Sequence, residues 1–398
     1  MIRRLLETTL RQIAGQYPVV TLTGPRQSGK TTLVRAVFDG YDYVSLEEPD
    51  QRAFAEEDPR GFLGQFSSAV ILDEVQRAPD LFSYIQSIVD EADRPGRFIL
   101  TGSQNFLLMR SISQSLAGRS AVLHLLPFSL SELEGRPPFP LEEIGHLLPS
   151  AQRSSSIDVM EVLFRGFYPR IHDKGLDPGQ WLGNYYQTYI ERDVRSIVNV
   201  GDIEAFGRFI RLCAGRCGQL LNLSALANDC GITHTTARRW LSVLEASFLV
   251  TLLRPHYRNF SKRLIKTPKL YFLDTGLLCY LLRIRSAEEL RFHNARGAVF
   301  ENYILTELLK TYYHQGKEPD LYFWRDSTGH EIDVLIDWGE TQVPLEIKSG
   351  QTVARDFFAG LDYWRRLIGE AAAPAALVYG GDRTYRRQDV TVYSWASL

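Results

Sequence analysis

The sequence predicts an α/β protein of several domains that begins with a mostly parallel sheet. Over residues 18–128, apolar strands alternate with stretches of helical spacing, a pattern typical of strands that are buried on both faces. A glycine-rich turn follows the first of these strands, and a helical middle separates them from a mixed helix-and-strand C-terminal part. The length of 398 residues is enough for about two to three domains.

Five strands and their connections define the first domain. The strands are PVVTLTG, YDYVSLEEP, AVILDEV, RFILTGS and SAVLHLLPF, and the helical connections include KTTLVRAVF and LFSYIQSIVDEA. Prolines and a serine run then predict a loop or linker. We therefore expect four segments: an ATPase-like core over 1–134, a linker over 135–156, a helical lid and winged-helix region over 157–290, and an α/β domain over 291–398.

Composition narrows the class of protein. Hydrophobic residues at 44% and charged residues at 23% are ordinary for a soluble globular chain. The net charge of −2 argues against a uniformly basic nucleic-acid binder, so any basic surface must be local. We expect no signal peptide and no membrane span. The four cysteines are too few and too irregular for a zinc site or disulfide framework, which favours reduced core residues and the cytoplasm.

A phosphate-binding loop is the strongest local signal. The motif G-x-x-x-x-G-K-T follows an apolar strand and opens a helix, which is the context that it requires. Its glycines allow backbone N–H groups to face phosphate oxygens, and the helix N-terminus adds a positive dipole end. Lys30 is expected to reach the β- and γ-phosphates, and Thr31 to hold Mg²⁺. The predicted nucleotide contacts are Gly24, Pro25, Arg26, Gln27, Ser28, Gly29, Lys30, Thr31 and Thr32.

A second acidic motif complements the loop. The buried strand Val70-Ile71-Leu72 ends in Asp73 and Glu74. Asp73 is expected in the metal shell, and Glu74 is expected to polarise the water that attacks the γ-phosphate. The next strand ends in Ser103, Gln104 and Asn105; one of these senses the γ-phosphate, or they simply begin a loop.

The segments GPRQSGKTT, SLEEPD, LDEVQ, ILTGSQN and SLAGRS resemble the AAA+ superfamily of P-loop ATPases. They are similar to a prokaryotic family that joins this ATPase to a C-terminal domain of unknown function, and the resemblance covers nearly the whole chain. It implies that Lys30, Thr31, Asp73 and Glu74 bind and hydrolyse ATP with Mg²⁺. It also implies a homo-oligomer in which an arginine acts in trans. Arg119 and Arg192 are both candidates, and a surface ion pair is the alternative for either.

Residues 223–249 have the spacing of a helix-turn-helix, with Gly231 in the turn and Thr233 as the N-cap of the second helix. A stretch without acidic residues follows, and two strands there would form a wing. Arg238 and Arg239 on the second helix would extend this basic surface. Contact with the phosphates of duplex DNA is one interpretation, and a protein-interaction module is the other. The basic residues of the stretch are Arg254, Arg258, Lys262, Arg263, Lys266 and Lys269.

The stretch HEIDVLIDWGETQVPLEIKSG, residues 330–350, reads as a β-hairpin. A two-residue turn at Gly339-Glu340 suits a type II′ hairpin. In that register Asp333 faces Glu346 and Glu331 faces Lys348. Facing carboxylates repel each other, so either the register differs or a positive group, for which a divalent metal is the obvious candidate, lies between them.

The order of elements from residue 297 onward is α-β-β-β-α-β, which resembles the core of PD-(D/E)XK nucleases. The resemblance implies that Asp333, Glu346 and Glu301 hold Mg²⁺, while Lys348 orients or activates the attacking water. Ile332 stands where a proline is common in that motif. The alternatives are that Lys348 only pairs with Glu331 across the strands, or that the fold is an inactive binding module.

These observations are consistent with three different functions. The first is an AAA+ ATPase coupled to DNA binding or processing. The second is an ATP-regulated, Mg²⁺-dependent DNA nuclease. The third is a nucleotide-dependent switch that signals through protein contacts.

Overall fold

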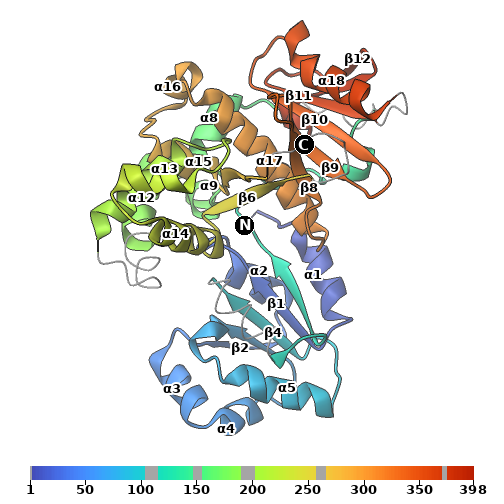
Figure 1. The fold of residues 1–398 in the computed structure, drawn as a ribbon. Coiled ribbons are helices and arrows are strands. Elements are labelled where there is room, and N and C mark those ends of the chain that lie inside the picture. Colours follow the sequence, from blue (N-terminus) through green and yellow to red (C-terminus); the bar gives the residue numbers. More distant parts are fainter. Residues whose placement is uncertain (1, 104–114, 147–154, 190–201, 257–265, 370–373) are drawn as a thin grey trace. The chain divides into compact units, whose positions relative to one another are not determined.

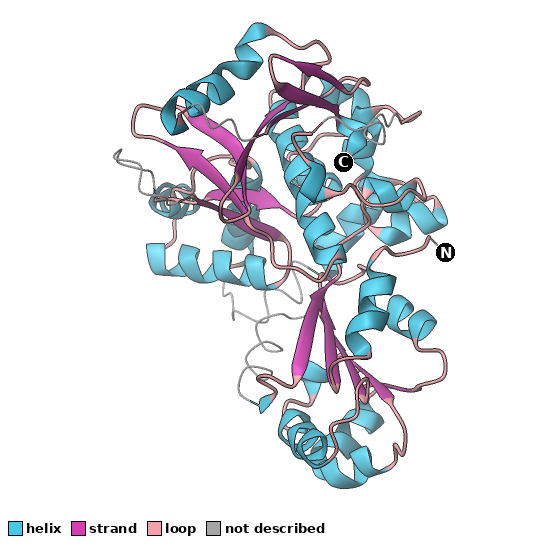
Figure 2. Cartoon of the chain, turned by 90° about the vertical axis from the view of Figure 1, so that its right-hand side faces the viewer, coloured by secondary structure: helices cyan, strands magenta, loops and turns pink. Residues whose placement is uncertain are grey.

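The computed structural model describes residues 2–103, 115–146, 155–189, 202–256, 266–369 and 374–398. The chain divides into two compact units. Unit 1 comprises Met1–Phe128, Ala246–Phe248 and Tyr312–Glu318, and unit 2 comprises Ser129–Glu245, Leu249–Thr311 and Pro319–Leu398. Figures 1 and 2 show the ribbon of both units, and each unit is described by itself below.

Unit 1 is built on a five-stranded parallel sheet with the order β2-β3-β4-β1-β5. All five strands that we predicted for this region are present. The strands are β1 (Val19–Thr23), β2 (Asp42–Ser45), β3 (Val70–Asp73), β4 (Phe98–Gly102) and β5 (Ser120–His124). The helical elements are α1 (Leu6–Ala14), α2 (Lys30–Val37), α3 (Pro49–Glu57), α4 (Pro59–Gly64), η1 (Val75–Arg77) and α5 (Leu81–Glu91).

Helices cover both faces of this sheet. Alternate residues of each strand point to opposite faces, so Val20 of β1 packs with α1 and α2, whereas Val19 packs with α3, α4 and α5. The central strands β1, β3 and β4 are buried along their whole length. This explains their continuous apolar sequences and confirms the predicted parallel α/β sheet.

Unit 2 is built on a mixed eight-stranded sheet with the order β12-β13-β11-β10-β9-β8-β6-β7. The pairs β10–β11, β11–β13 and β6–β8 are parallel, and the others are antiparallel. The strands are β6 (Val250–Pro255), β7 (Lys269–Phe272), β8 (Leu321–Arg325), β9 (Glu331–Asp337), β10 (Gln342–Lys348), β11 (Ala375–Tyr379), β12 (Tyr385–Arg387) and β13 (Val390–Ser394).

The predicted order α-β-β-β-α-β is present in the chain beyond residue 128 as α17, β8, β9, β10, α18 and β11. The helices of this part of the chain are α7 (Leu130–Leu133), η2 (Leu141–Glu143), α8 (Val159–Arg165), α9 (Pro169–Lys174), α10 (Pro178–Tyr185), α12 (Ile203–Ala214), α13 (Leu223–Cys230), α14 (His234–Ala246), α15 (Thr275–Leu281), α16 (Ala287–Phe292), α17 (Arg296–His314), η5 (Arg355–Phe358), α18 (Ala359–Ile368) and η6 (Trp395–Ser397).

The predicted helix-turn-helix consists of α13 and α14. Gly231 ends α13 in the left-handed conformation, with φ of 70°, which glycine adopts without strain. The Thr233 hydroxyl accepts a hydrogen bond from the Thr236 N–H at 3.1 Å, so the predicted N-cap is confirmed. The antiparallel pair β6–β7 follows these helices, and β6 also pairs with β8. The strand pair is therefore part of the large sheet.

The segment that we predicted as a loop or linker packs against β13 where the structure describes it. Phe139 and Ile144 are buried, and the Tyr393 hydroxyl accepts a hydrogen bond from the Gly145 N–H at 3.0 Å. The Thr391 hydroxyl donates to the Gly145 carbonyl at 2.7 Å. The apolar side chains of residues 139–146 are therefore part of the packing of unit 2.

The four cysteines are buried and free, in agreement with the prediction of reduced core residues. Among the helices that the structure describes, none is both long and apolar enough to cross a membrane.

Candidate functional site

The phosphate-binding loop connects β1 to α2 and has the strained backbone that its glycines predict. Gly24 and Gly29 have φ of 151° and 92°, and Gln27 between them has φ of 67°. A Cβ atom on Gly24 would lie 2.2 Å from the carbonyl oxygen of Leu125. Only glycine fits at this position, because the loop passes directly over the backbone that follows β5.

Lys30 begins α2 and is buried. Its ammonium donates hydrogen bonds to the carbonyl oxygens of Gly24 and Pro25, at 3.0 Å and 2.9 Å. Burial lowers the pKa of Lys30 to about 8, although the negative charges of Glu74 and Asp73 oppose this shift. A nearby phosphate would supply the negative charge that restores the ordinary pKa.

Asp73 ends β3 and accepts hydrogen bonds from hydroxyl groups of three other elements. Its carboxylate accepts hydrogen bonds from Thr31 at 3.0 Å and 3.1 Å, from the Tyr43 hydroxyl at 2.9 Å, and from the Thr101 hydroxyl. Burial, and then the charge of Asp73, raise the pKa of Tyr43 to about 12. Tyr43 and Thr101 were not predicted from the sequence. The signal that identifies them is the strand order, since β2 and β4 flank β3.

Glu74 follows β3 in the left-handed conformation, with φ of 55°. Its Oε2 accepts hydrogen bonds from the Ser103 hydroxyl at 2.9 Å and from the Gln76 side-chain amide at 2.5 Å. Ser103 was one of the three polar residues predicted at this strand end, and Gln76 was not predicted. The other two predicted residues, Gln104 and Asn105, lie outside the described residues.

These residues fit a magnesium–nucleotide complex. Thr31 and Asp73 present adjacent oxygen atoms, which are the ligands that Mg²⁺ prefers. The Ser28 hydroxyl in the loop is buried and has no hydrogen-bond partner within the part of the chain that the structure describes. Buried polar groups normally have partners, so a ligand in the loop would satisfy it.

The remaining predicted loop residues lie around this core. Pro25 is buried, whereas Gln27 is exposed, and Thr32 is exposed on the first turn of α2. Arg26 contacts the Glu47 carboxylate at 3.1 Å.

One of the two arginines proposed to act in trans is described. Arg119 forms a surface ion pair with Asp90, and its Nη2 lies 3.0 Å from Asp90 Oδ2. This is the alternative that we considered for it, although a role in a neighbouring subunit stays a prediction. Arg192 lies outside the described residues.

The C-terminal hairpin has the predicted register. Asp337 pairs with Gln342, and the ladder continues to Val334 and Leu345. The Trp338 N–H donates to the Thr341 carbonyl at 2.9 Å, and φ of Gly339 is 81°. The next step of this register would bring Asp333 and Glu346 opposite each other, as the turn predicts.

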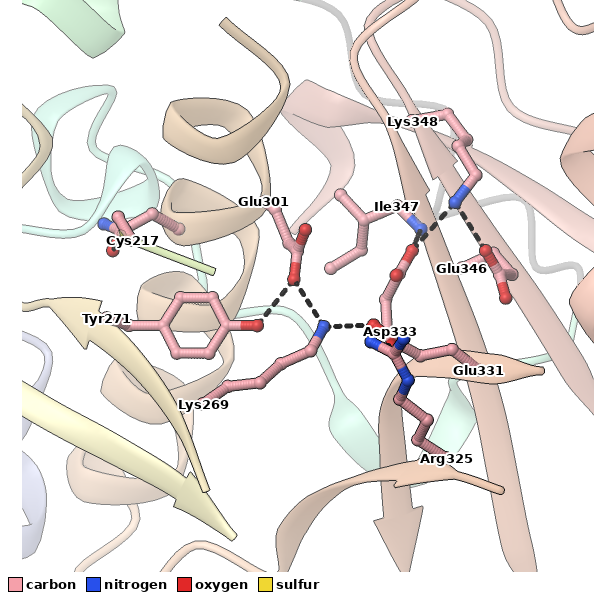
Figure 3. Close-up of polar contacts among 11 residues, drawn as sticks. Cys217, Lys269, Tyr271, Glu301, Arg325, Glu331, Asp333, Glu346, Ile347 and Lys348 are labelled. Carbon is pink, nitrogen blue, oxygen red and sulfur yellow. Dashed lines mark hydrogen bonds and ion pairs between the residues drawn. The ribbon is translucent and has the colours of Figure 1, made fainter. Parts of the chain in front are cut away.

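The positive group between these two acids is Lys348 (Figure 3). Its Nζ lies 3.0 Å from Asp333 Oδ2 and 2.5 Å from Glu346 Oε2. Asp333 Oδ2 also accepts a hydrogen bond from the Ile347 N–H at 2.8 Å. The predicted alternative, in which Lys348 pairs with Glu331, is wrong because Glu331 pairs with Lys269 and Arg325.

The third predicted acid, Glu301 on α17, binds a different lysine. Its Oε1 accepts a hydrogen bond from the Tyr271 hydroxyl at 2.5 Å and lies 3.3 Å from Lys269 Nζ. Lys269 also contacts Glu331, and Figure 3 shows its side chain extending from β7 between the two acids. We predicted Lys269 on an exposed basic surface, but only 3% of its side chain is exposed. That part of the prediction is wrong, because Lys269 is buried and forms ion pairs with Glu301 and Glu331.

The electrostatics of this cluster follow from burial and ion pairing. Burial alone would lower the pKa of Lys269, but Glu301, Glu331 and Asp333 outweigh it and raise the pKa above its usual range. Burial also opposes a charged Lys348, but Asp333 and Glu346 raise its pKa. Burial, followed by repulsion from Asp333, raises the pKa of Glu346 well above its usual range.

The arrangement does not fit a magnesium ion, because ammonium groups lie between the carboxylates. No three side chains of the types His, Cys, Asp and Glu gather as metal ligands in the portion of the chain with described coordinates. The nuclease-like metal site at Asp333, Glu346 and Glu301 stays a prediction from the sequence, and this arrangement of ammonium groups does not support it.

The surface of the helix-turn-helix presents the two predicted arginines. Arg238 and Arg239 on α14 are exposed, and Arg254 on β6 is exposed too. Three further basic residues of the predicted wing, Arg258, Lys262 and Arg263, lie outside the described residues.

Comparison with known families divides the chain into three matched ranges. Residues 16–134 match a family described as AAA domain. Residues 156–288 and 296–398 match two domains of unknown function, DUF8612 and DUF4143.

Relatives cover nearly the whole chain. An uncharacterized protein of Mycobacterium tuberculosis is 30% identical over 393 residues, which is 98% of this chain and 82% of the relative. An uncharacterized protein of Methanocaldococcus jannaschii is 22% identical over 354 residues, 83% of this chain and 74% of the relative. Among solved structures, a Walker-type ATPase of Pyrococcus abyssi is 16% identical with a TM-score of 0.43, covering 71% of this chain and 96% of that one. The loop motif, the parallel sheet that carries it, the matched families and the relative that is 30% identical assign the chain to the family of P-loop AAA-type ATPases with a C-terminal DUF4143 domain.

Proposed function

We propose that the chain binds ATP with Mg²⁺ and hydrolyses its terminal phosphoanhydride bond. The observation that carries this proposal is the hydrogen-bonded contact between Thr31, at the start of α2, and Asp73, at the end of β3. Lys30 lies beside this pair and Glu74 follows Asp73. These four residues supply the cation, the metal ligands and the base that phosphoryl transfer needs.

Each residue has a separate role in this proposal. The loop N–H groups and Lys30 hold the phosphate oxygens, and Thr31 and Asp73 hold Mg²⁺, which neutralises charge on the β- and γ-phosphates when bound. Glu74 accepts a proton from the attacking water. The water oxygen forms a bond to the γ-phosphorus while the bond to the bridging oxygen breaks, so ADP leaves with that oxygen.

The test compares wild-type protein with Glu74→Gln, a variant of nearly equal size that cannot accept the proton. General-base catalysis contributes about 10²–10⁴-fold, so phosphate release should fall by roughly that factor while ATP still binds. Lys30→Ala is the companion variant, and it should lose both binding and turnover while keeping the wild-type circular dichroism spectrum. Equal turnover in wild type and both variants would reject the proposal.

We further propose that the helix-turn-helix contacts duplex DNA and that ATP turnover is coupled to this contact. The observation that favours it is the exposure of Arg238 and Arg239 on α14. This is the second helix of the motif, which typically enters the major groove, and arginines are common phosphate contacts. The antiparallel strands β6 and β7 follow this helix in the chain and belong to the eight-stranded sheet. A helix-turn-helix surface also serves protein contacts, so turnover measured with and without DNA separates the two uses.

The other sequence hypotheses remain alternatives with distinct outcomes. A nucleotide switch gains support if turnover is negligible and DNA affinity does not depend on salt. An ATP-regulated nuclease gains support if DNA cleavage depends on Glu346. A homo-oligomer with Arg119 or Arg192 acting in trans gains support if a catalytically dead subunit restores turnover to an arginine variant.

A further inference from the structure

The carboxylate cluster of unit 2 receives one of its cations from outside the C-terminal domain. Glu301 and Glu331 lie in the range that matches DUF4143, whereas Lys269 lies in the range that matches DUF8612. Lys269 stands on β7, at the edge of the shared eight-stranded sheet. The sheet therefore brings a lysine of one matched domain between two acids of the next (Figure 3).

The charges of the cluster are nearly balanced by protein groups alone. It holds three cationic side chains, namely Lys269, Lys348 and Arg325, and four acidic ones, namely Glu301, Glu331, Asp333 and Glu346. A divalent ion would have to displace ammonium groups that are already paired. The displaced ammonium of Lys269 would remain buried without a partner, which is far costlier than an exposed one.

One oxygen of each predicted metal ligand is engaged by a protein group, namely Glu301 Oε1, Asp333 Oδ2 and Glu346 Oε2. Glu331 uses both oxygens, Oε1 for Lys269 and Oε2 for Arg325. Glu346 uses Oε2 for Lys348, and its Oε1 lies so close to α18 that a Cβ atom on Gly360 would be 2.1 Å away. Mg²⁺ requires several oxygens at about 2.0–2.1 Å in octahedral order, so binding here would require these oxygens to give up their ion pairs.

We infer that Lys269 and Lys348 act as permanent counter-ions in place of a divalent metal, so that the C-terminal domain does not hydrolyse phosphodiester bonds. Lys269 also joins the two matched domains of unknown function, because its partners come from α17 and β9. The resemblance to a nuclease then extends to the order of elements and to the identity of the acids, but not to metal-dependent chemistry.

Iron-directed cleavage of the full-length chain tests this inference directly. Fe²⁺ with ascorbate cuts the backbone near sites where the ion binds, and mass spectrometry locates the cuts. We expect no cuts in wild-type protein near Glu301, Asp333 or Glu346. Cuts there that added Mg²⁺ suppresses would overturn the inference, as would DNA cleavage that Glu346→Ala abolishes. Cuts near Thr31 and Asp73 report on the ATP site separately, so failure of the proposed ATPase function is distinguishable.

Lys269→Met provides the second test, with Arg254→Met on the neighbouring strand as the matched control. Breaking a buried ion pair is strongly destabilising, and we expect the melting temperature to fall by roughly 10 °C. Mn²⁺ should recover part of this loss, because the variant leaves Glu301 without its cation and Glu331 with Arg325 alone. Arg254 is exposed, and its variant should melt within about 2 °C of wild type.

Equal melting of the two variants would overturn the inference. If Lys269→Met does not fold, Lys269→Arg, which keeps the charge, should fold, and its failure to do so would count against the inference.

Discussion

Lys30 should make nucleotide binding depend on pH above neutrality. Burial lowers its pKa to about 8. Lys30 is therefore charged in about nine-tenths of the free molecules at pH 7 and in about one-tenth at pH 9. The charged form is the one that binds phosphate, and the phosphate charge should raise the pKa again in the complex. The free protein must therefore take up a proton at Lys30 when nucleotide binds at pH 9.

The size of the effect follows from that pKa. The binding-competent fraction falls about tenfold between pH 7 and pH 9, which corresponds to about 1.4 kcal/mol. We expect a non-hydrolysable ATP analogue with Mg²⁺ to bind about tenfold more weakly at pH 9, with uptake of about 0.9 proton per site. At pH 7 the uptake by Lys30 should be about 0.1 proton.

Isothermal titration calorimetry measures both quantities. Titrations at pH 9 in two buffers of different ionisation enthalpy give the number of protons taken up. Lys30→Arg is the matched control, because a guanidinium stays charged at this pH and its binding should be independent of the buffer. Equal heats for wild type in the two buffers at pH 9 would refute the reasoning.

Three further predictions concern the loop, the partly buried His124 and the basic helix. Gly24→Ala places a Cβ atom 2.2 Å from a backbone carbonyl oxygen, so nucleotide binding should be lost and stability should fall by about 2–4 kcal/mol. Gly40→Ala, where a Cβ atom meets nothing within 4 Å, is the thermal-melt control that should stay near wild type. Burial lowers the pKa of His124 to about 4, below its unfolded value of about 6.5. Because the unfolded chain binds that proton more readily, stability should be lost as pH falls from 6.5 through 4. The loss of stability should reach about 2–3 kcal/mol near pH 4.5. In denaturant melts, His124→Phe should lose less stability than wild type over this pH range. Identical pH profiles of the two proteins would contradict this prediction. Arg238→Glu together with Arg239→Glu should lower the slope of log affinity for duplex DNA against log salt by about 2, whereas an unchanged slope in fluorescence anisotropy would remove this helix from the interface.

The sequence predicts features whose determinants are close together along the chain. The phosphate-binding loop is fixed by two glycines, a lysine and a threonine within eight residues, and the hairpin register is fixed by the turn at Gly339. Local backbone chemistry decides both, because a positive φ is available mainly to glycine.

Partners from distant segments could not be predicted in the same way. Tyr43 and Thr101 reach Asp73 only because β2 and β4 flank β3, and strand order is not a local property. Lys269 reads as part of a basic stretch in the sequence, yet the fold buries it between Glu301 and Glu331. The repulsion between Asp333 and Glu346 was enough to predict a positive group between them, and that group is Lys348 of the same hairpin. Only the position of Lys269 required the arrangement of the whole sheet.

The most direct measurement of the central proposal is phosphate release from Mg²⁺–ATP by the wild-type chain and by Glu74→Gln at equal nucleotide occupancy. The account predicts turnover by wild type, and a loss of about 10²–10⁴-fold in Glu74→Gln with ATP binding retained. Turnover that is unchanged in Glu74→Gln, or absent from wild type under conditions in which ATP is bound, would contradict it.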